Sequence, residues 1–219
     1  MPEQQVEEAG EEASPEQREP VCILDAVICV HFVGANLHAL LVEVLRKADL
    51  VLLVPQEVCD EVVGKDRKYP GIRLRWTRLA ASRHVRVLPA LQAESAPPRV
   101  VEVFEDVRGR QFEDALRERR DLGEAVVVAH GVHYQDLGHE VLVAIDDGAG
   151  QAIAAGRDLQ VITMEDVLEM AVEFSMFPTE GQLKKAYEKL QGFGEGLPPY
   201  ATTGLSSRFR KWRSRKENE

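Results

Sequence analysis

The chain has 219 residues, of which 44% are hydrophobic and 29% charged, and its formal net charge is −10. This composition is typical of a soluble globular protein, and the acidic balance excludes a surface that is basic throughout, so any contact with nucleic acid has to be local. No apolar run approaches the roughly 18 residues of a membrane span, and the acidic N-terminus has no hydrophobic signal region.

The first half of the chain begins with a composition shift. Residues 1–20 hold seven glutamates and one arginine, which predicts a disordered acidic tail. Apolar, β-branched runs then predict buried strands over 21–24 and 51–54. Apolar residues at helical spacing predict a helix within 35–45, and Pro55 suits the first turn of another that runs to about 63. Further along, 74–81 could be helical and 84–88 is a plausible strand.

The second half continues the alternation of helices and strands. A broken amphipathic pattern covers 99–120 around Gly109, and Asp121 opens a helix. Strands are expected over 141–145 and 159–162, with helices over 149–156 and 165–177. Fully apolar strands that alternate with helices predict an α/β protein, a three-layer α/β/α fold with a central, mainly parallel sheet.

These patterns divide the chain into three parts. Residues 1–20 form the acidic tail, 21–177 the folded domain, and 178–219 a C-terminal extension with a helical pattern over 182–191 and a basic end. The three cysteines, Cys22, Cys29 and Cys59, form no C-x-x-C pair, which favours buried thiols in a reducing compartment. We therefore expect a cytoplasmic protein with no membrane association.

Acidic residues follow two of the predicted strands directly. Asp25 ends the first strand, and Asp146 and Asp147 end the strand over 141–145. In open α/β sheets ligands bind outside the carboxyl ends of the strands, so a parallel sheet would place these acids at one edge. Mg²⁺ and Mn²⁺ prefer oxygen ligands, and such an ion can activate water for phosphodiester hydrolysis.

Each acid also has a purely structural interpretation. Asp25 could cap a helix starting at Ala26, and Asp146-Asp147-Gly148 could be a strand-to-helix turn. Glu124 stands three residues after Asp121, which is the spacing of a capping box. Glu57 and Glu61 are one helical turn apart and could lie on a solvated helix face.

Taken in order, four segments resemble the motifs of PIN-domain nucleases. They are 23–25 (Ile-Leu-Asp), 54–62 (Val-Pro-Gln-Glu-Val-Cys-Asp-Glu-Val), 121–125 (Asp-Leu-Gly-Glu-Ala) and 145–147 (Ile-Asp-Asp). The similarity is greatest to the branch with an Asp-x-Gly-Glu-Ala motif, whose members are described as nucleic-acid-binding, and it spans roughly residues 21–175. That branch usually has an arginine five residues after the last aspartate, where this chain has Gln151.

The resemblance implies catalytic roles for Asp25, Glu61, Glu124 and Asp146, and a metal bound by Asp25, Glu124 and Asp146 with Asp147 as an addition. It implies a Mg²⁺- or Mn²⁺-dependent endoribonuclease acting on single-stranded RNA, either a toxin of a toxin–antitoxin pair or an RNA-processing enzyme. An antitoxin or other protein partner and a homodimer are compatible with it. The alternative is a catalytically weak or inactive module of the same fold that binds RNA or protein.

The basic end of the chain is a separate candidate for RNA binding. Six cations fall within residues 208–216, interleaved with two aromatic residues. One hypothesis is contact with RNA through phosphate charge and aromatic stacking. The other is a solvated or self-docking tail that meets the acidic N-terminus. The residues expected to bind RNA are Arg208, Phe209, Arg210, Lys211, Trp212 and Arg213.

Overall fold

The computed structural model describes residues 18–118, 122–193 and 196–218. Most of the predicted acidic tail, residues 1–17, therefore lies outside the described residues, and so does Asp121, the expected start of a helix.

Five short strands form one sheet in which every neighbouring pair is parallel. The strand order is β3-β2-β1-β4-β5, with β1 at the centre. Val21 of β1 pairs with Val51 on one side and with Val141 on the other. The strands are β1 (Val21–Leu24), β2 (Val51–Pro55), β3 (Val85–Leu88), β4 (Val141–Ala144) and β5 (Gln160–Ile162).

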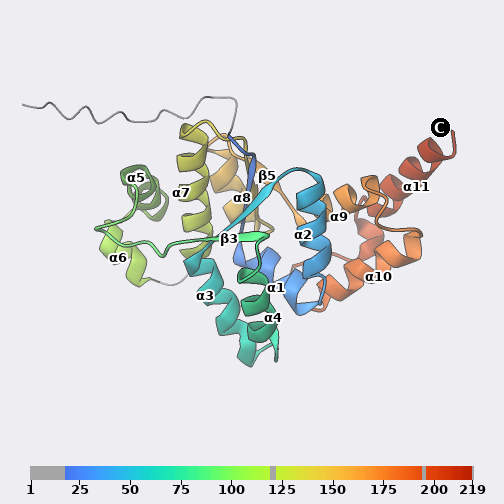
Figure 1. Cartoon of the computed structure of the whole chain (residues 1–219), viewed down its shortest axis with the longest axis horizontal. Helices are drawn as coiled ribbons and strands as arrows, with labels where there is room; N and C mark the ends of the chain where they lie inside the picture. The colour runs from blue at the N-terminus through green and yellow to red at the C-terminus, as the bar shows by residue number, and fades with distance from the viewer. Residues whose placement is uncertain (1–17, 119–121, 194–195, 219) are drawn as a thin grey trace, which may run out of the picture.

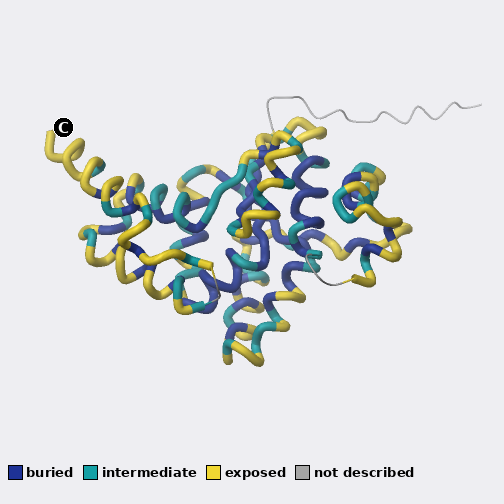
Figure 2. The backbone as a smooth tube through the Cα atoms, turned by 180° about the vertical axis from the view of Figure 1, so that it is seen from behind, coloured by how far each residue is buried: buried dark blue, intermediate teal, exposed yellow. Residues whose placement is uncertain are grey.

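Helices cover both faces of this sheet. On one face α7 (Leu122–Asp136) contacts β1, β2 and β4, and α5 (Pro98–Arg108) packs on its outer side. On the other face lie α2 (His38–Lys47) and α9 (Met164–Glu173), which contact each other (Figure 1). The predicted three-layer α/β/α fold with a parallel sheet is thus confirmed. Buried residues concentrate in the sheet and in the helix faces against it (Figure 2).

The remaining helices connect the strands. Phe112 starts a separate helix after Gly109, whose positive φ of 61° ends α5 at the expected break. The remaining elements up to β5 are α1 (Ala26–Gly34), α3 (Gln56–Gly64), the 3₁₀ turn η2 (Lys65–Arg67), α4 (Ile72–Ala80), α6 (Phe112–Arg117) and α8 (Gly148–Ala155). Helix α1 was expected only as the helix that Asp25 could cap. Its length was not predicted, because it is apolar nearly all round and shows no amphipathic period.

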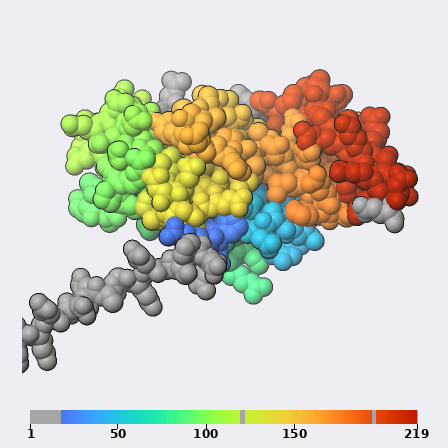
Figure 3. Space-filling model, turned by 90° about the horizontal axis from the view of Figure 1, so that it is seen from above, coloured from blue at the N-terminus to red at the C-terminus, as the bar shows by residue number. Residues whose placement is uncertain are grey.

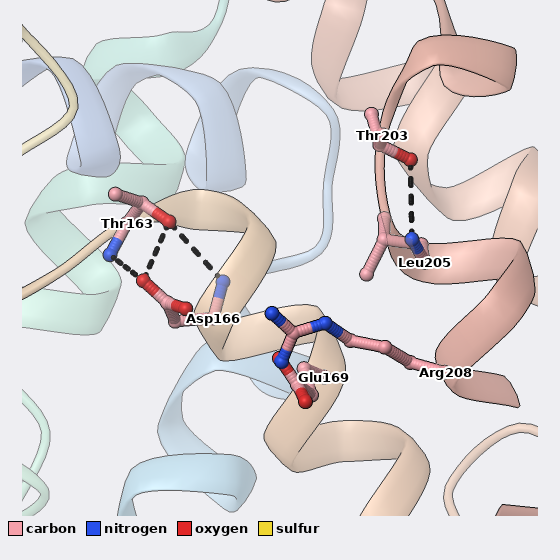
Figure 4. Close-up of polar contacts among 6 residues, drawn as sticks. All are labelled: Thr163, Asp166, Glu169, Thr203, Leu205 and Arg208. Carbon is pink, nitrogen blue, oxygen red and sulfur yellow. Dashed lines mark hydrogen bonds and ion pairs between the residues drawn. The ribbon is translucent and has the colours of Figure 1, made fainter. Parts of the chain in front are cut away.

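The C-terminal extension is folded and packs on the domain. It contains α10 (Glu180–Gln191), a 3₁₀ turn η3 (Tyr200–Thr202) and α11 (Leu205–Lys216). Helix α10 contacts α1, and α11 contacts α9. Arg208 of α11 bonds Glu169 of α9, close to the capping box in which Thr163 and Asp166 begin α9 (Figure 4). The basic segment, expected as a tail, is therefore a helix, and it forms one end of the molecule, opposite α5 and α6 (Figure 3).

Within the described residues, no helix is long and apolar enough to cross a membrane.

Candidate functional site at the carboxyl edge of the sheet

Asp25 stands where the central strand ends. Its backbone N–H donates to the carbonyl of Ala144, so the pairing of β1 with β4 continues to this residue. Its side chain caps α1, with Oδ2 accepting from the Val27 N–H at 3.2 Å. The expected capping role is confirmed. Asp25 is also only 2% exposed, which is rare for an aspartate whose partner is a backbone N–H.

The carboxylates of Asp25 and Glu61 meet above the first turn of α7. A Cβ atom at Gly123 would lie 3.4 Å from Asp25 Oδ1 and 3.4 Å from Glu61 Oε2. The two oxygens therefore lie within twice that distance of each other. Glycine is the residue that leaves this space open, because any side chain at 123 would enter it.

Glu124 reaches the start of α8. A Cβ atom at Gly150 would lie 3.2 Å from Glu124 Oε2. Asp147 contacts the same glycine, because its Oδ1 caps α8 by accepting from the N–H groups of Ala149 at 2.8 Å and Gly150 at 3.2 Å. The expected strand-to-helix turn is thus present. Glu124 and Asp147 share a neighbour at the same edge of the sheet.

Asp146 faces a different group of residues. Its Oδ1 accepts from the Met164 N–H at the start of α9, at 3.1 Å. Among neighbouring charges, that of His31 has the largest effect on the pKa of Asp146, which it lowers. His31 is buried, and its Nδ1 donates to the Leu190 carbonyl at 2.8 Å. Of the two neighbouring aspartates, it is Asp147 whose charge acts on Asp25.

Three of the predicted acids, Asp25, Glu61 and Glu124, line an open cavity of about 770 Å³, which we call the acid pocket. Asp146 and Asp147 are not among its lining residues. Glu57, which the sequence patterns did not mark as functional, does line the acid pocket. Its Oε1 accepts from the Leu91 N–H at 2.6 Å, and its Oε2 is buried with no hydrogen-bond partner. Its predicted place on a solvated helix face is therefore wrong. The charged residues of the acid pocket are Asp25, Glu57, Asp60, Glu61, Lys65 and Glu124.

Burial sets the electrostatics of the acid pocket. The pKa of Asp25 is raised to about 6, mainly by burial; two backbone hydrogen bonds oppose the rise, and the charges of Glu61 and Asp147 add to it. Burial likewise raises the pKa of Glu57 and of Asp146. An unusually high carboxyl pKa beside other acids marks a place where negative charge lacks compensation. Lys65 compensates part of it, since its Nζ lies 3.2 Å from Glu61 Oε1.

The donor set suits a hard cation, although its arrangement is loose. Carboxylate oxygens of Asp25, Glu61 and Glu124 face one cavity, and such oxygens are the ligands that Mg²⁺ and Mn²⁺ prefer. Across the residues that the structure describes, no three His, Cys, Asp or Glu side chains are close enough together to hold a metal ion. Gln151, at the position where arginine is usual in the resembling branch, donates to the Ile145 carbonyl at 3.1 Å.

The residues expected to bind RNA on α11 fall into two groups. Phe209 is 2% exposed and Trp212 is half-buried, and the two rings pack together at 5.5 Å between centroids. Stacking of a base on Phe209 does not fit this placement, because the ring lies in the interface with the domain. Arg208 bonds Glu169. The exposed cations of the helix are Arg208, Arg210, Lys211, Arg213, Arg215 and Lys216.

No protein-family model matches the chain, and no curated protein matches it.

Proposed function

We propose that this protein is a metal-dependent endoribonuclease that hydrolyses phosphodiester bonds of single-stranded RNA at the acid pocket. The observation that supports it best is the approach of Asp25 Oδ1 and Glu61 Oε2 to the same space above Gly123, at the carboxyl edge of the central strand. Like charges held close together cost free energy unless a cation joins them. The preference for RNA rests on the resemblance to PIN-domain nucleases.

Asp25, Glu61 and Glu124 are the residues that would hold Mg²⁺ or Mn²⁺, after a movement that brings the three carboxylates closer together than they stand in the structure. Such an ion, when bound, polarises a phosphate and lowers the pKa of water. Asp25 is the rigid member of the set, because it is buried and fixed by its cap on α1. Glu61 is exposed and one turn before Lys65, which would leave it free to exchange the lysine for the ion. Asp147 would add its charge from the start of α8.

The acid pocket also has to accept an anionic substrate. Lys65 is positioned for this, since it lines the cavity beside Glu61. When Glu61 turns to an ion, the ammonium group of Lys65 becomes available to a phosphate oxygen. An open cavity of about 770 Å³ lies in the range of pockets that take a small ligand, so a splayed single strand fits it better than a duplex.

Cleavage of a fluorescent single-stranded RNA, measured against Mg²⁺ and Mn²⁺ concentration, tests this proposal. We expect a saturable dependence on the ion and a loss of at least a hundredfold in Asp25→Asn. The matched control is Asp66→Asn, since Asp66 accepts backbone hydrogen bonds from Gly71 and Arg73 outside the acid pocket. Cleavage that survives excess EDTA, or that persists in Asp25→Asn, would contradict the proposal.

A second function, a non-catalytic module that binds RNA or protein, is favoured by one observation. The carboxylate of Glu61 is already paired with Lys65, as in a site that has no need of an ion. This hypothesis predicts RNA binding without cleavage at any concentration of Mg²⁺ or Mn²⁺. The same titration therefore separates the two functions.

A toxin-type nuclease would have a protein antitoxin as its partner, and both functions are compatible with a homodimer. Light scattering of the purified chain measures directly whether it forms a homodimer. We also propose that the protein is cytoplasmic, because Cys22, Cys29 and Cys59 are free and buried, as in proteins of a reducing compartment.

A further inference from the structure

A second, smaller cavity adjoins the acid pocket. It measures about 260 Å³ and lies between α1 and the turn that follows α3. Ala26, Val27, Glu61 and Lys65 line both cavities, so the two adjoin along these residues. We call the smaller one the tyrosine recess, after Tyr69.

The walls of the tyrosine recess differ from those of the acid pocket. Val27 and Val30 give it an apolar side, and Tyr69 gives it an aromatic one. His31 completes the wall, with its ring fixed by the bond from Nδ1 to the Leu190 carbonyl. A recess that is apolar and aromatic suits a flat, uncharged group.

The rim of the tyrosine recess is basic. Lys68 is exposed, with its ammonium group 5.3 Å from the centre of the Tyr69 ring, and Lys65 stands at the junction with the acid pocket. Two cations stand beside the aromatic wall, against one carboxylate, that of Glu61, which pairs with Lys65. Within a chain of net charge −10, this local excess of positive charge suits a ligand with a flat part and an anionic part.

The Tyr69 ring is held in place by a residue of the C-terminal extension, Phe193. It packs against Phe193 at 5.5 Å between centroids, and Phe193 in turn lies against Gly34, where a Cβ would be 2.4 Å from the ring. The C-terminal extension therefore supports one wall of the tyrosine recess. A rigid aromatic wall binds at lower entropic cost than a mobile one.

We propose that the tyrosine recess is a nucleotide subsite: it takes the base next to the scissile phosphate against Tyr69, and Lys65 and Lys68 bind the adjoining phosphate. This inference rests on the proposed function, because the acid pocket has to hold the scissile phosphate for the recess to receive the neighbouring base. The two cavities adjoin at Val27 and Lys65, which line both, so neighbouring nucleotides can occupy them.

Calorimetric titration of the full chain in EDTA with uridine 5′-monophosphate, adenosine 5′-monophosphate and inorganic phosphate tests the subsite without cleavage. Tyr69→Leu should weaken both nucleotides by about five- to a hundredfold, the range for loss of one stacked base, and leave phosphate unchanged. Tyr69→Phe should bind like the parent. Lys68→Gln should weaken all three ligands, whereas Lys184→Gln, an exposed lysine of α10, should change none.

Two outcomes overturn the subsite. One is that inorganic phosphate binds as tightly as the nucleotides, which would mean that the tyrosine recess holds an adventitious ion only. The other is nucleotide binding that is absent or that Lys68→Gln and Tyr69→Leu leave unchanged. Lys68 is exposed, so its variant remains informative even where Tyr69→Leu does not fold.

The failure of the subsite is distinguishable from the failure of the nuclease proposal. Nucleotide binding that depends on Tyr69 in a chain that cleaves nothing would sustain the subsite and reject the nuclease. Metal-dependent cleavage whose KM is unchanged in Tyr69→Leu would do the reverse.

Discussion

Asp25 and Glu61, 36 positions apart in the chain, direct carboxylate oxygens to one point above Gly123, each 3.4 Å from where a Cβ would stand. Neither oxygen position follows from helix or strand geometry alone. Asp25 is set by its cap on α1, Glu61 by the second turn of α3, and the glycine of α7 leaves the space between them. Three elements thus meet where two carboxylates face one space.

Replacing Asp25 by asparagine should remove the cost of burying a carboxylate, together with its smaller repulsion from Glu61. The pKa of Asp25 is about 6 in the folded protein against an ordinary 3.8, so between pH 4 and 6 the folded state binds more protons than the unfolded state. The contribution of Asp25 to stability therefore falls as the pH rises through this window. At pH 7 we expect Asp25→Asn to stabilise the metal-free protein by about 1–3 kcal/mol, or several degrees in Tm.

Asparagine is as good an N-cap as aspartate, so the hydrogen bond from the Val27 N–H survives the substitution. The measurement is thermal unfolding from pH 4 to pH 8 in EDTA. Asp66→Asn serves as the control because Asp66 is also an acceptor of backbone hydrogen bonds and lies away from the acid pocket. A variant that is less stable than the parent at pH 7, with the same dependence on pH, would show that Asp25 is not under strain.

The sequence pattern predicted the sheet better than it predicted the helices. Strands β1, β2 and β4 were recognisable because each is apolar throughout and bounded by polar or turn residues. Helix α1 was indicated only by its cap, Asp25, because a helix buried on nearly all sides has no amphipathic period. Helix α11 escaped because its sequence is dominated by cations, and what holds it is tertiary: Leu205 and Phe209 in the core.

The acids of the site were predicted as a set, but their partners were not. Asp25, Asp146 and Asp147 were expected at one edge of a parallel sheet, and Glu61 was added to them only by the resemblance. The structure brings the carboxylates of Asp25 and Glu61 to the same space. Whether Asp146 or Asp147 faces Asp25 depends on the turn from β4 into α8, whose dihedral angles sequence patterns leave open. Glu57 was missed because its role depends on Leu91, 34 residues away in a loop.

Gly150 tests whether Glu124 belongs to the site. A Cβ there would lie 2.9 Å from Ile145 Cγ2 and 3.2 Å from the Glu124 carboxylate, so Gly150→Ala has to push Glu124 aside. We expect a loss of about 1–3 kcal/mol in stability and a smaller rise of Tm on addition of Mg²⁺. Gly148→Ala is the control, because a Cβ there meets nothing within 4 Å, and it should be neutral or stabilising by up to about 1 kcal/mol.

Scanning calorimetry of both variants with and without Mg²⁺ provides the comparison. A Mg²⁺-induced shift in Gly150→Ala equal to that of the parent would place Glu124 outside the metal site. An equal reduction in Gly148→Ala would point to a general effect on α8.

The exposed cations of α11 should bind RNA through its phosphates alone, since Phe209 is buried. Lys211 and Arg215 are four residues apart and line the same surface groove beside α9. Replacing both by alanine should remove two phosphate contacts and reduce the slope of log K against log salt by about 1.4, with affinity falling equally for all RNA sequences.

The control for α11 is the pair Lys185 and Lys189 on α10, which are exposed and also four residues apart. Replacing them changes the net charge by the same amount. A salt slope that falls equally in both double variants would reflect overall charge, and an unchanged slope in the α11 variant would assign the helix to a protein partner or to solvent. Thermal unfolding has to show that Leu205 and Phe209 still dock the helix.

Asp146 and Asp147 present the sharpest test of the site, because the resemblance favours the first and the structure favours the second. The charge of Asp147 raises the pKa of Asp25, whereas Asp146 bonds the Met164 N–H and acts on His31. Both can be changed to asparagine without loss of their backbone partners, since an amide oxygen still accepts from Met164 or caps α8. A difference between the two variants therefore reports on charge.

Asp146→Asn and Asp147→Asn can be compared by two measurements, the pKa of Asp25 and the rate of RNA cleavage, and the first needs no catalysis. Asp147→Asn should lower the pKa of Asp25, measured by carboxyl NMR titration in EDTA, because it removes a like charge. Asp146→Asn should leave that pKa close to about 6, since Asp25 is affected mainly by burial, its own cap and Glu61. In cleavage assays with saturating Mg²⁺, Asp147→Asn should cost more than Asp146→Asn by at least tenfold. The reverse order in both measurements would make Asp146 the fourth acid of the site, and α8 would then have to turn to admit it.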